Sequence, residues 1–339
     1  MDTAATIRPL QSLRLIAADI KLAHSVFAMP FALLVAFMAA LGPTRGTFRL
    51  VSSNDPPSND FFSHPYLWPE YAGEFWPRFA GQLALIVLAM FFARTCAMLS
   101  NRIVDREIDA RNPRTAQRAI PSGQLPLSRA VMAFITCALL FLVVCAAFGI
   151  FHGNWWPLIL GLPVLAWICA YPYLKRITML CHFYLGASLA MSPIAAAIAI
   201  EPSSIDPSSP LFQPAILLLS GMVLCWVAGF DIIYALQDLD IDRAQHLRSI
   251  PSRFGMERAL AVARLLHAAA LGALTAALLV DDRFDLLFGV GVAIVAILLA
   301  IEHATVSRWG TGRIALAFFT LNGLISCLVG ALGIADVLM

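Results

Sequence analysis

The stretch FAGQLALIVLAMFFARTCAMLSNRIVDREID, from Phe79 to Asp109, decides the fold class, because an apolar run long enough to cross a bilayer ends directly in a motif rich in carboxylates. A second apolar run ends in the same way in YALQDLDID, from Tyr234 to Asp242. In each motif the polar residues recur every four positions: Asn101, Asp105 and Asp109 in the first, and Tyr234, Asp238 and Asp242 in the second. If the apolar helices continue into these motifs, a step of four residues turns the chain by roughly 400°. Each trio is therefore expected to lie along one stripe of one helix.

The composition is that of a membrane protein. Sixty per cent of the 339 residues are hydrophobic and 13% are charged, and the mean hydropathy is +0.79. These values exclude an ordinary soluble chain and indicate a polytopic α-helical membrane protein. The net charge of +2 and the scatter of basic residues over several loops argue against a nucleic-acid partner. All seven cysteines fall within apolar runs without CxxC spacing, which is typical of buried packing residues.

Nine membrane spans are predicted from the apolar runs. They cover Ser25 to Leu41, Phe79 to Ser100, Ala130 to Ile150, Trp155 to Tyr171, Thr178 to Ile200, Phe212 to Leu236, Leu260 to Val280, Phe284 to Ala304 and Ile314 to Val337. The long loop from Gly42 to Arg78 is expected to be irregular and partly helical, with no chemistry of its own.

The charges of the connections predict the orientation. Lys and Arg gather before the first span and after the second, fourth, sixth and eighth spans, whereas the intervening loops are neutral or acidic. Loops retained in the cytoplasm are rich in Lys and Arg. We therefore expect a multi-pass protein of a bacterial-type inner membrane, with the N-terminus and both motifs in the cytoplasm and the C-terminus outside.

The two motifs together predict a metal and diphosphate site. Four aspartates, at positions 105, 109, 238 and 242, would repel one another at a membrane boundary unless they are neutralised. Hard oxygen ligands of this kind select Mg²⁺, which shares its coordination shell with substrate phosphates. The nearby basic residues Arg114, Arg118, Lys175 and Arg248 are then expected to bind the diphosphate. The alternative is that the aspartates are solvated among arginines at the boundary, and the matched spacing on two spans favours the metal.

Two further charges lie inside the predicted spans. Arg94 precedes Asn101 by seven residues, and Asp231 precedes Asp238 by seven, which places each about 10 Å deeper and within roughly 20° of the stripe. An ionisable group at such depth costs at least about 2–3 kcal/mol unless it has a partner or faces a cavity. Two hypotheses remain open: a structural ion pair between them, or a polar floor that binds a small acceptor. Tyr234 lies between this floor and the carboxylates, where its hydroxyl is expected either to meet a metal-bound water or the acceptor, or to sit at the membrane interface.

At these residues the sequence resembles the UbiA superfamily of membrane-embedded aromatic prenyltransferases. NRIVDREIDARNPRTAQRAIPSG (residues 101–123) resembles the first Asp-rich motif and its loop, and GFDIIYALQDLDIDRAQHLRSIPSRFG (residues 229–255) resembles the second. Supporting matches occur at IKLAHSVFAMPFAL (residues 20–33) and YPYLKRITMLCHFYLG (residues 171–186). The resemblance implies a single all-α membrane domain over residues 1–339, a bundle of nine helices around a central cavity. The recurrence of the motifs after the second and sixth spans suggests two related halves.

The resemblance also implies the ligands and the reaction. Mg²⁺ would be held by Asn101, Asp105, Asp109, Asp238 and Asp242, and the four aspartates with Tyr234 would form the catalytic set. The metal and arginines would stabilise the departing diphosphate of a polyprenyl donor, and an electron-rich aromatic ring would attack the allylic cation in the membrane. One position departs from many members: Arg102 follows Asn101 where Asp is common. We expect Arg102 to alter the surroundings of the diphosphate without removing the metal.

The acceptor stays open at this point. The motifs resemble those of the group that prenylates 4-hydroxybenzoate for ubiquinone, and the alternative acceptor is a naphthoate of the 1,4-dihydroxy-6-naphthoate type for menaquinone. A rival of another class is an ion-coupled secondary transporter, since Arg94 and Asp231 would also suit a substrate pathway. Against it, no pair of spans is broken by Gly or Pro in corresponding positions, and the carboxylates lie at the boundary of the membrane.

Overall fold

The computed structural model describes residues 14–16, 27–43, 69–314 and 316–339, and within these ranges the regular structure is entirely helical. The α-helices are α2 (Met29–Leu41), α3 (Pro69–Val104), α4 (Arg106–Arg111), α5 (Leu127–His152), α6 (Trp156–Ile177), α7 (Cys181–Ile200), α8 (Pro214–Ala235), α9 (Leu239–Ala244), α10 (Ile250–Val280), α11 (Leu286–Trp309) and α12 (Asn322–Leu338). Shorter helical turns are η2 (Pro202–Ile205), η3 (Leu236–Asp238), η4 (Gly310–Arg313) and the π-helical η5 (Leu316–Leu321). The predicted all-α fold class is confirmed.

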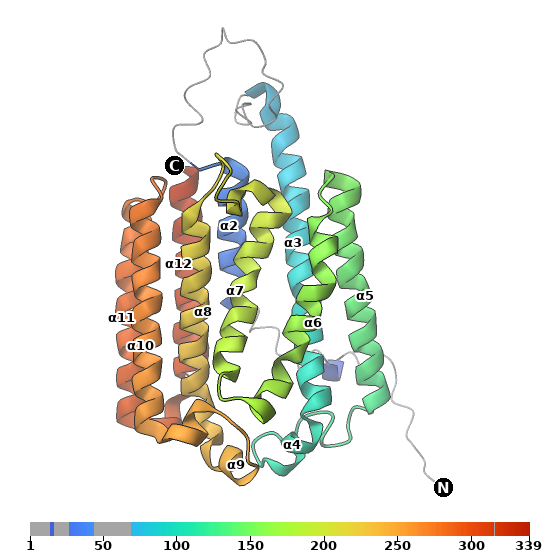
Figure 1. Ribbon diagram of the computed structural model, residues 1–339, viewed down its shortest axis with the longest axis vertical. Coiled ribbons are helices and arrows are strands. Elements are labelled where there is room, and N and C mark those ends of the chain that lie inside the picture. The colour runs from blue at the N-terminus through green and yellow to red at the C-terminus, as the bar shows by residue number, and fades with distance from the viewer. Residues whose placement is uncertain (1–13, 17–26, 44–68, 315) are drawn as a thin grey trace.

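The long helices run side by side along the long axis of the molecule, and α8 occupies the interior (Figure 1). Helix α8 packs most extensively against α10 and α7. Its sequence PAILLLSGMVLCWVAGFDIIYA is apolar over most of its surface, with Asp231 near its C-terminal end, as expected of a helix surrounded by other helices. Its fully buried side chains include Ile216, Leu219, Met222 and Trp226. The core of the bundle is therefore built around this helix.

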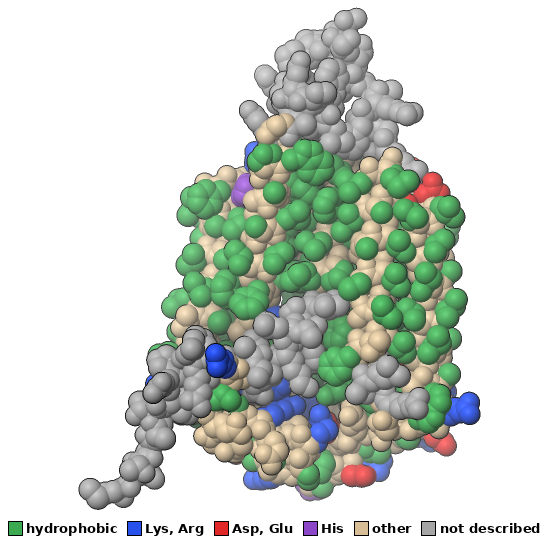
Figure 2. Space-filling model, turned by 180° about the vertical axis from the view of Figure 1, so that it is seen from behind, with side chains coloured by type: hydrophobic (Ala, Val, Ile, Leu, Met, Phe, Trp, Pro, Cys, Tyr) green, Lys and Arg blue, Asp and Glu red, His purple; other side chains and the backbone are tan. Residues whose placement is uncertain are grey.

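The outer surface of the bundle is hydrophobic, as expected of a surface in contact with lipid. Large apolar side chains are exposed on α5, among them Leu139, Val143, Ile150 and Phe151, and Figure 2 shows hydrophobic side chains over the side of the bundle. Among the described residues, eight helices are long and apolar enough to cross a membrane, and α2 is a shorter apolar helix. The first predicted span began at Ser25, and residues 25–26 lie outside the described ranges. The chain is thus an integral membrane protein. The described part holds eight full-length candidate spans and the shorter α2, which corresponds to the first of the nine predicted spans.

The two ends of the bundle carry different connections. The segments that join α3 to α5, α6 to α7, α8 to α10 and α11 to α12 all lie at the end that carries α4 and α9 (Figure 1). The C-terminus of α12 lies at the opposite end (Figure 1). Lys and Arg side chains gather at the α4 and α9 end (Figure 2). The arrangement agrees with the alternation of charge along the sequence. Within the long loop predicted from Gly42 to Arg78, residues 44–68 lie outside the described ranges, and α3 already begins at Pro69.

A glycine allows α7 to approach α8 closely. A Cβ atom added at Gly186 would lie 2.4 Å from the main-chain carbonyl oxygen of Leu224. That oxygen belongs to the backbone of the central helix, so it cannot move aside as the tip of a side chain could. The contact between α7 and α8 therefore requires glycine at this position.

Replacing Gly186 with Ala is expected to destabilise the protein by about 1–3 kcal/mol, because the added methyl group forces the two helices apart. Gly221 provides the matched control, since an added Cβ there would meet nothing within 4 Å. Gly221→Ala is expected to be neutral or to stabilise α8 by up to about 1 kcal/mol, because Ala favours the helix over Gly. Thermal unfolding in detergent measures both effects. Equal melting temperatures for the two variants would contradict the close approach.

Candidate active site at the polar end of the bundle

Both motifs begin where a long helix is interrupted. Helix α3 ends at Val104, and Asp105 adopts φ −90° and ψ 8° before α4 begins. Helix α8 ends at Ala235, and Asp238 adopts φ −105° and ψ 7° before α9 begins. The same sparsely populated backbone conformation thus occurs at the middle aspartate of each motif. The expectation that each motif continues one regular helix is wrong, because both helices turn here across the end of the bundle.

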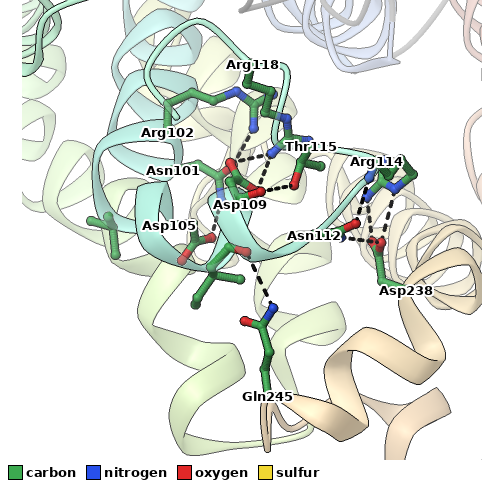
Figure 3. Close-up of polar contacts among 12 residues, drawn as sticks. Asn101, Arg102, Asp105, Asp109, Asn112, Arg114, Thr115, Arg118, Asp238 and Gln245 are labelled. Carbon is green, nitrogen blue, oxygen red and sulfur yellow. Dashed lines mark hydrogen bonds and ion pairs between the residues drawn. The ribbon is translucent and has the colours of Figure 1, made fainter. Parts of the chain in front are cut away.

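The first motif nevertheless keeps its four-residue step. The N–H of Asp105 donates to the carbonyl of Asn101 at 3.0 Å, and the N–H of Asp109 donates to that of Asp105 at 2.7 Å. The side-chain amide of Asn101 donates to Oδ2 of Asp105 at 3.0 Å. The trio therefore stays on one side of the chain through the break (Figure 3).

The loop after the first motif reaches the second motif at Asp238. Arg114 donates from Nε to Oδ1 of Asp238 at 3.1 Å and from Nη2 to Oδ2 at 2.6 Å. The amide of Asn112 donates to the same Oδ1 at 3.0 Å, and Nη1 of Arg114 donates to the hydroxyl of Tyr234 at 3.2 Å. Figure 3 shows Asn112 and Arg114 converging on Asp238. These contacts unite the two motifs into one polar site.

The sequence did not predict that Asn112 takes part in the site. Its only signal was its place in the loop that follows the first motif. It is buried, and its side-chain oxygen also accepts the N–H of Arg114 at 3.0 Å. Asn112 therefore orients the loop that presents Arg114.

Asp109 is neutralised by the same loop. Nη1 of Arg118 lies 2.8 Å from Oδ1 and 2.6 Å from Oδ2 of Asp109, and the hydroxyl of Thr115 donates to the main-chain oxygen of Asp109 at 3.0 Å. Asp109 is 6% exposed. A carboxylate at that depth needs a counter-charge, and Arg118 provides it by folding the loop back onto α4.

Asp105 receives its counter-charge from α6. Nη2 of Arg176 donates to Oδ1 of Asp105 at 3.1 Å and to the carbonyl of Val104 at 2.8 Å. Burial raises the pKa of the Asp105 carboxyl above its ordinary value, although the hydrogen bond from Arg176 opposes this shift. The carboxyl is therefore less readily ionised than a solvated aspartate.

Arg102 acts on Asn101. It is buried, and its Nη1 donates to the side-chain oxygen of Asn101 at 3.0 Å. Because the amide nitrogen of Asn101 already donates to Asp105, both ends of this amide are engaged. The residue that departs from the usual motif thus orients one of the predicted metal ligands.

The fourth aspartate, Asp242, is the least exposed to solvent. Asp242 is 2% exposed, and its Oδ2 accepts the hydroxyl of Ser249 at 2.9 Å. The ammonium group of Lys175 on α6 interacts electrostatically with Asp242, Asp231 and Asp238. Lys175 therefore brings a positive charge to these carboxylates, and its role in binding a diphosphate stays a prediction.

Arg248 lies differently from the other predicted diphosphate residues. Its Nη1 donates to the carbonyl of Ile177 at 2.6 Å, and its main-chain N–H donates to the carbonyl of Lys175 at 2.7 Å. It lines a surface hollow between α9 and the α6–α7 turn, together with Arg243, His246 and Arg253. The side chain thus binds the end of α6 and makes no ion pair with the four aspartates in this structure.

Asp231 has a partner that the sequence did not predict. Its Oδ2 lies 2.7 Å from Nδ1 of His182 on α7. Of the two hypotheses for Asp231 and Arg94, the structural ion pair between them is therefore not observed, and the polar floor that binds an acceptor stays a prediction. Arg94 lies on α3, partly buried. The signal for His182 was a histidine within an apolar span, which costs free energy unless it is paired or functional.

The donor set suits Mg²⁺ in its chemistry, since carboxylates and an amide oxygen are hard ligands. Among the described residues, however, no three acidic, His or Cys side chains converge closely enough to hold one ion. Asp105, Asp109 and Asp238 are occupied by Arg176, Arg118 and Arg114. A metal diphosphate can therefore bind these carboxylates only if arginines exchange their aspartate contacts for phosphate oxygens, which guanidinium groups bind equally well.

Comparison with known proteins gives consistent matches. The sequence model of the UbiA prenyltransferase family matches residues 65–324. A 4-hydroxybenzoate octaprenyltransferase from Serratia proteamaculans (strain 568) is 31% identical over 225 residues, which cover 66% of this chain and 72% of that protein. The apo structure of a UbiA homolog from Aeropyrum pernix K1 superposes with a TM-score of 0.70 at 28% identity, covering 92% of this chain and 98% of that one. A UbiA homolog from Archaeoglobus fulgidus bound to GPP and Mg²⁺ shares the fold, with a TM-score of 0.63 at 18% identity over 96% of this chain and 100% of that one.

Arg118→Ala is expected to destabilise the protein by about 3 kcal/mol, because it leaves the buried carboxylate of Asp109 without a counter-charge. Adding Asp109→Asn to this variant should restore much of the loss, since the isosteric amide carries no charge. Arg106→Ala is the control, on the helix that carries Asp109: the side chains of Arg106 and Glu107 are 41% and 72% exposed, and such a pair contributes less than about 1 kcal/mol. Chemical or thermal unfolding in detergent compares the three variants. A loss of stability for Arg118→Ala as small as that for Arg106→Ala would be incompatible with a buried ion pair between Arg118 and Asp109.

Proposed function

The chain belongs to the UbiA prenyltransferase family, and from this premise we propose that it transfers a polyprenyl group from a polyprenyl diphosphate to 4-hydroxybenzoate in respiratory quinone biosynthesis, with Mg²⁺ as its metal. The observation that carries this proposal is the contact of Arg114 and Asn112 with Asp238. It brings a cationic loop and two sets of carboxylates to one place at the end of a membrane bundle. The combination suits a ligand with an anionic head and a long apolar tail.

The head of the donor binds among the polar groups. Asp105, Asp109, Asp238 and Asp242, with Asn101, would hold the metal, and the metal would supply positive charge that neutralises the diphosphate and assists its departure. Arg114 and Arg118 leave their carboxylates and bind phosphate oxygens instead, and Lys175 adds a third positive charge. These contacts stabilise the charge that develops on the leaving group. Because Arg114 and Arg118 belong to one loop, donor binding and loop rearrangement occur together.

The tail and the reacting carbon are kept from water by the bundle. Above the motifs α8 is lined by buried apolar residues, and the sides of the bundle face lipid. An allylic cation that forms between these two regions meets the acceptor ring before it meets solvent. Tyr234, whose hydroxyl contacts Arg114, lies at the border of the two regions and shields the cation on the head side.

The acceptor assignment is supported by relatives. The curated proteins that match this chain at 31% identity are named 4-hydroxybenzoate octaprenyltransferases, so 4-hydroxybenzoate is the acceptor that we propose. Asp231 lies next to the carboxylate set and takes part in acceptor binding. Membership of a transferase family favours this function over the ion-coupled transporter.

We also propose that the polar end faces the cytoplasm of a bacterial-type inner membrane, with the N-terminus inside and the C-terminus outside. The excess of Lys and Arg at this end supports that orientation. Cysteine placed at Arg111 should then be protected from a membrane-impermeant maleimide in intact cells, and cysteine placed at Asp206 should be labelled. Both positions are exposed. The reverse pattern of labelling would invert the topology.

The catalytic test uses purified protein, geranyl diphosphate, Mg²⁺ and 4-hydroxybenzoate, with the product identified by mass. Asp105→Ala and Asp238→Ala are each expected to lower turnover by a factor of about 100 or more, because each removes a charge-stabilising group from a site shielded from water. Chelation of Mg²⁺ by EDTA should abolish turnover in the unaltered protein. Asp240→Ala is the control, since Asp240 lies on α9 between the two aspartates and is exposed; it should keep normal activity. Normal turnover in Asp238→Ala would disprove the assignment of the second motif.

A further inference from the structure

A buried histidine–aspartate pair lies in the bundle beside the two motifs. Nδ1 of His182 lies 2.7 Å from Oδ2 of Asp231. His182 is 0% exposed, and Asp231 is 8% exposed. The pair joins α7 to α8, close to the start of α10.

The hydrogen of this contact can be assigned from its surroundings. The main-chain N–H of Ile250, at the start of α10, donates to Nε2 of His182 at 3.4 Å. A main-chain N–H can only donate, so Nε2 is the acceptor and the hydrogen resides on Nδ1. Nδ1–H therefore donates to Asp231. The same donation occurs if the ring is protonated, because Nδ1 carries a hydrogen in both states.

Asp231 keeps one oxygen for another ligand. His182 occupies Oδ2, whereas Oδ1 has no hydrogen-bond partner among the described residues. The buried side-chain atoms without a partner do not include Oδ1, and 12% of the Asp231 side chain is exposed. Oδ1 therefore borders accessible space. A carboxylate oxygen held in this way has no hydrogen to donate, so it selects a ligand that supplies one.

The position of Asp231 relates this oxygen to the site. Tyr171 and Lys175, one turn apart on α6, both interact electrostatically with Asp231 and with Asp242. Tyr171 also interacts with Asp105. Asp231 thus shares one interior region with carboxylates of both motifs, on the side nearer the apolar part of the bundle.

Building on the proposed transfer to an aromatic acceptor, we propose that His182 is a positioning residue that holds Asp231 so that its Oδ1 accepts the phenolic O–H of the acceptor. This contact orients the ring by its hydroxyl group and leaves the acceptor's carboxylate pointing away from Asp231, because two carboxylates repel. A hydrogen bond from the phenol to a carboxylate also increases the electron density of the ring carbons next to the hydroxyl, which are the carbons that an allylic cation attacks. The acceptor is accordingly selected for a free hydroxyl group.

A variant pair separates positioning from packing. His182→Leu removes the hydrogen-bond donor at Nδ1 and puts an apolar side chain of similar size in its place. His182→Asn places an amide N–H close to the position of Nδ1 and keeps the donor. With geranyl diphosphate, Mg²⁺ and 4-hydroxybenzoate, His182→Leu should raise the KM for 4-hydroxybenzoate by roughly tenfold, the usual size of the loss of one hydrogen bond to a charged group. The KM for geranyl diphosphate and the Mg²⁺ dependence should not change, and His182→Asn should restore the acceptor KM to within about threefold of the unaltered protein.

A second measurement does not depend on the stability of these variants. 4-Methoxybenzoate has the shape of the acceptor but no hydroxyl hydrogen, so it should inhibit the unaltered protein weakly, with an inhibition constant roughly tenfold or more above the dissociation constant of 4-hydroxybenzoate. In His182→Leu the preference for 4-hydroxybenzoate over 4-methoxybenzoate should become smaller. His267→Leu serves as a control. His267 is also buried, with 2% of its surface exposed, but it contacts His303 and the backbone of Trp226. The preference of this variant for 4-hydroxybenzoate over 4-methoxybenzoate should therefore stay unchanged.

The outcomes distinguish this inference from the function on which it rests. If the unaltered protein prenylates no hydroxylated aromatic, the proposed function fails, and this inference fails with it. If the unaltered protein is active but binds the methoxy analogue as well as the hydroxyl compound, only the role of Asp231 and His182 is overturned. Equal increases in both KM values for His182→Leu, without rescue by His182→Asn, would likewise show that the pair merely packs three helices together.

Discussion

The carboxylate of Asp238 accepts three hydrogen bonds from a loop more than 120 residues earlier in the chain, and the polar end of the bundle is organised around it. A carboxylate at the edge of a membrane is costly unless a positive charge and hydrogen-bond donors surround it. Arg114 and Asn112 meet both requirements, and in doing so they hold the first motif's loop against the second motif. Without this contact the two motifs would be separate polar ends of two helices.

The same physical demand explains the rest of the loop. Asp109 takes Arg118, and Asp105 takes Arg176 from α6. Three of the four aspartates thus form an ion pair with an arginine, and two of these arginines come from the loop after α4 and one from α6. The positive charges of the arginines reduce the repulsion among the aspartates. This arrangement is suited to exchange. Under the proposed function, a diphosphate with its metal would supply both signs of charge: the arginines would bind the phosphate oxygens, and the carboxylates would hold the metal.

The apolar helices determine where this chemistry can occur. Helix α8 is surrounded by other helices for most of its length, and the two aspartates of the second motif follow it, where the chain breaks at Asp238. The matching backbone conformation at Asp105 gives α3 the same form of ending. The two breaks turn α4 and α9 toward each other, and Gln245 at the end of α9 lies 3.5 Å from the carbonyl of Ile108 on α4. Deeper in the bundle, the charge of Asp231 is met by the hydrogen bond with His182.

The sequence by itself determined the membrane class, the approximate spans, the position of the two motifs at one end and the residue types of the site, because hydropathy and helical spacing are local properties of the chain. It did not determine the breaks at Asp105 and Asp238, which arise where two helices cross the end of the bundle. Nor did it determine which cation each aspartate would meet. The contact of Asp231 with His182 was not foreseen, and Arg248, which was expected at the diphosphate, binds the end of α6 in this structure. Asn112 was not foreseen at all. Such pairings join residues about 50 to 130 positions apart, and charged side chains take the partner that packing brings within about 3 Å. Only the tertiary structure decides which partner that is.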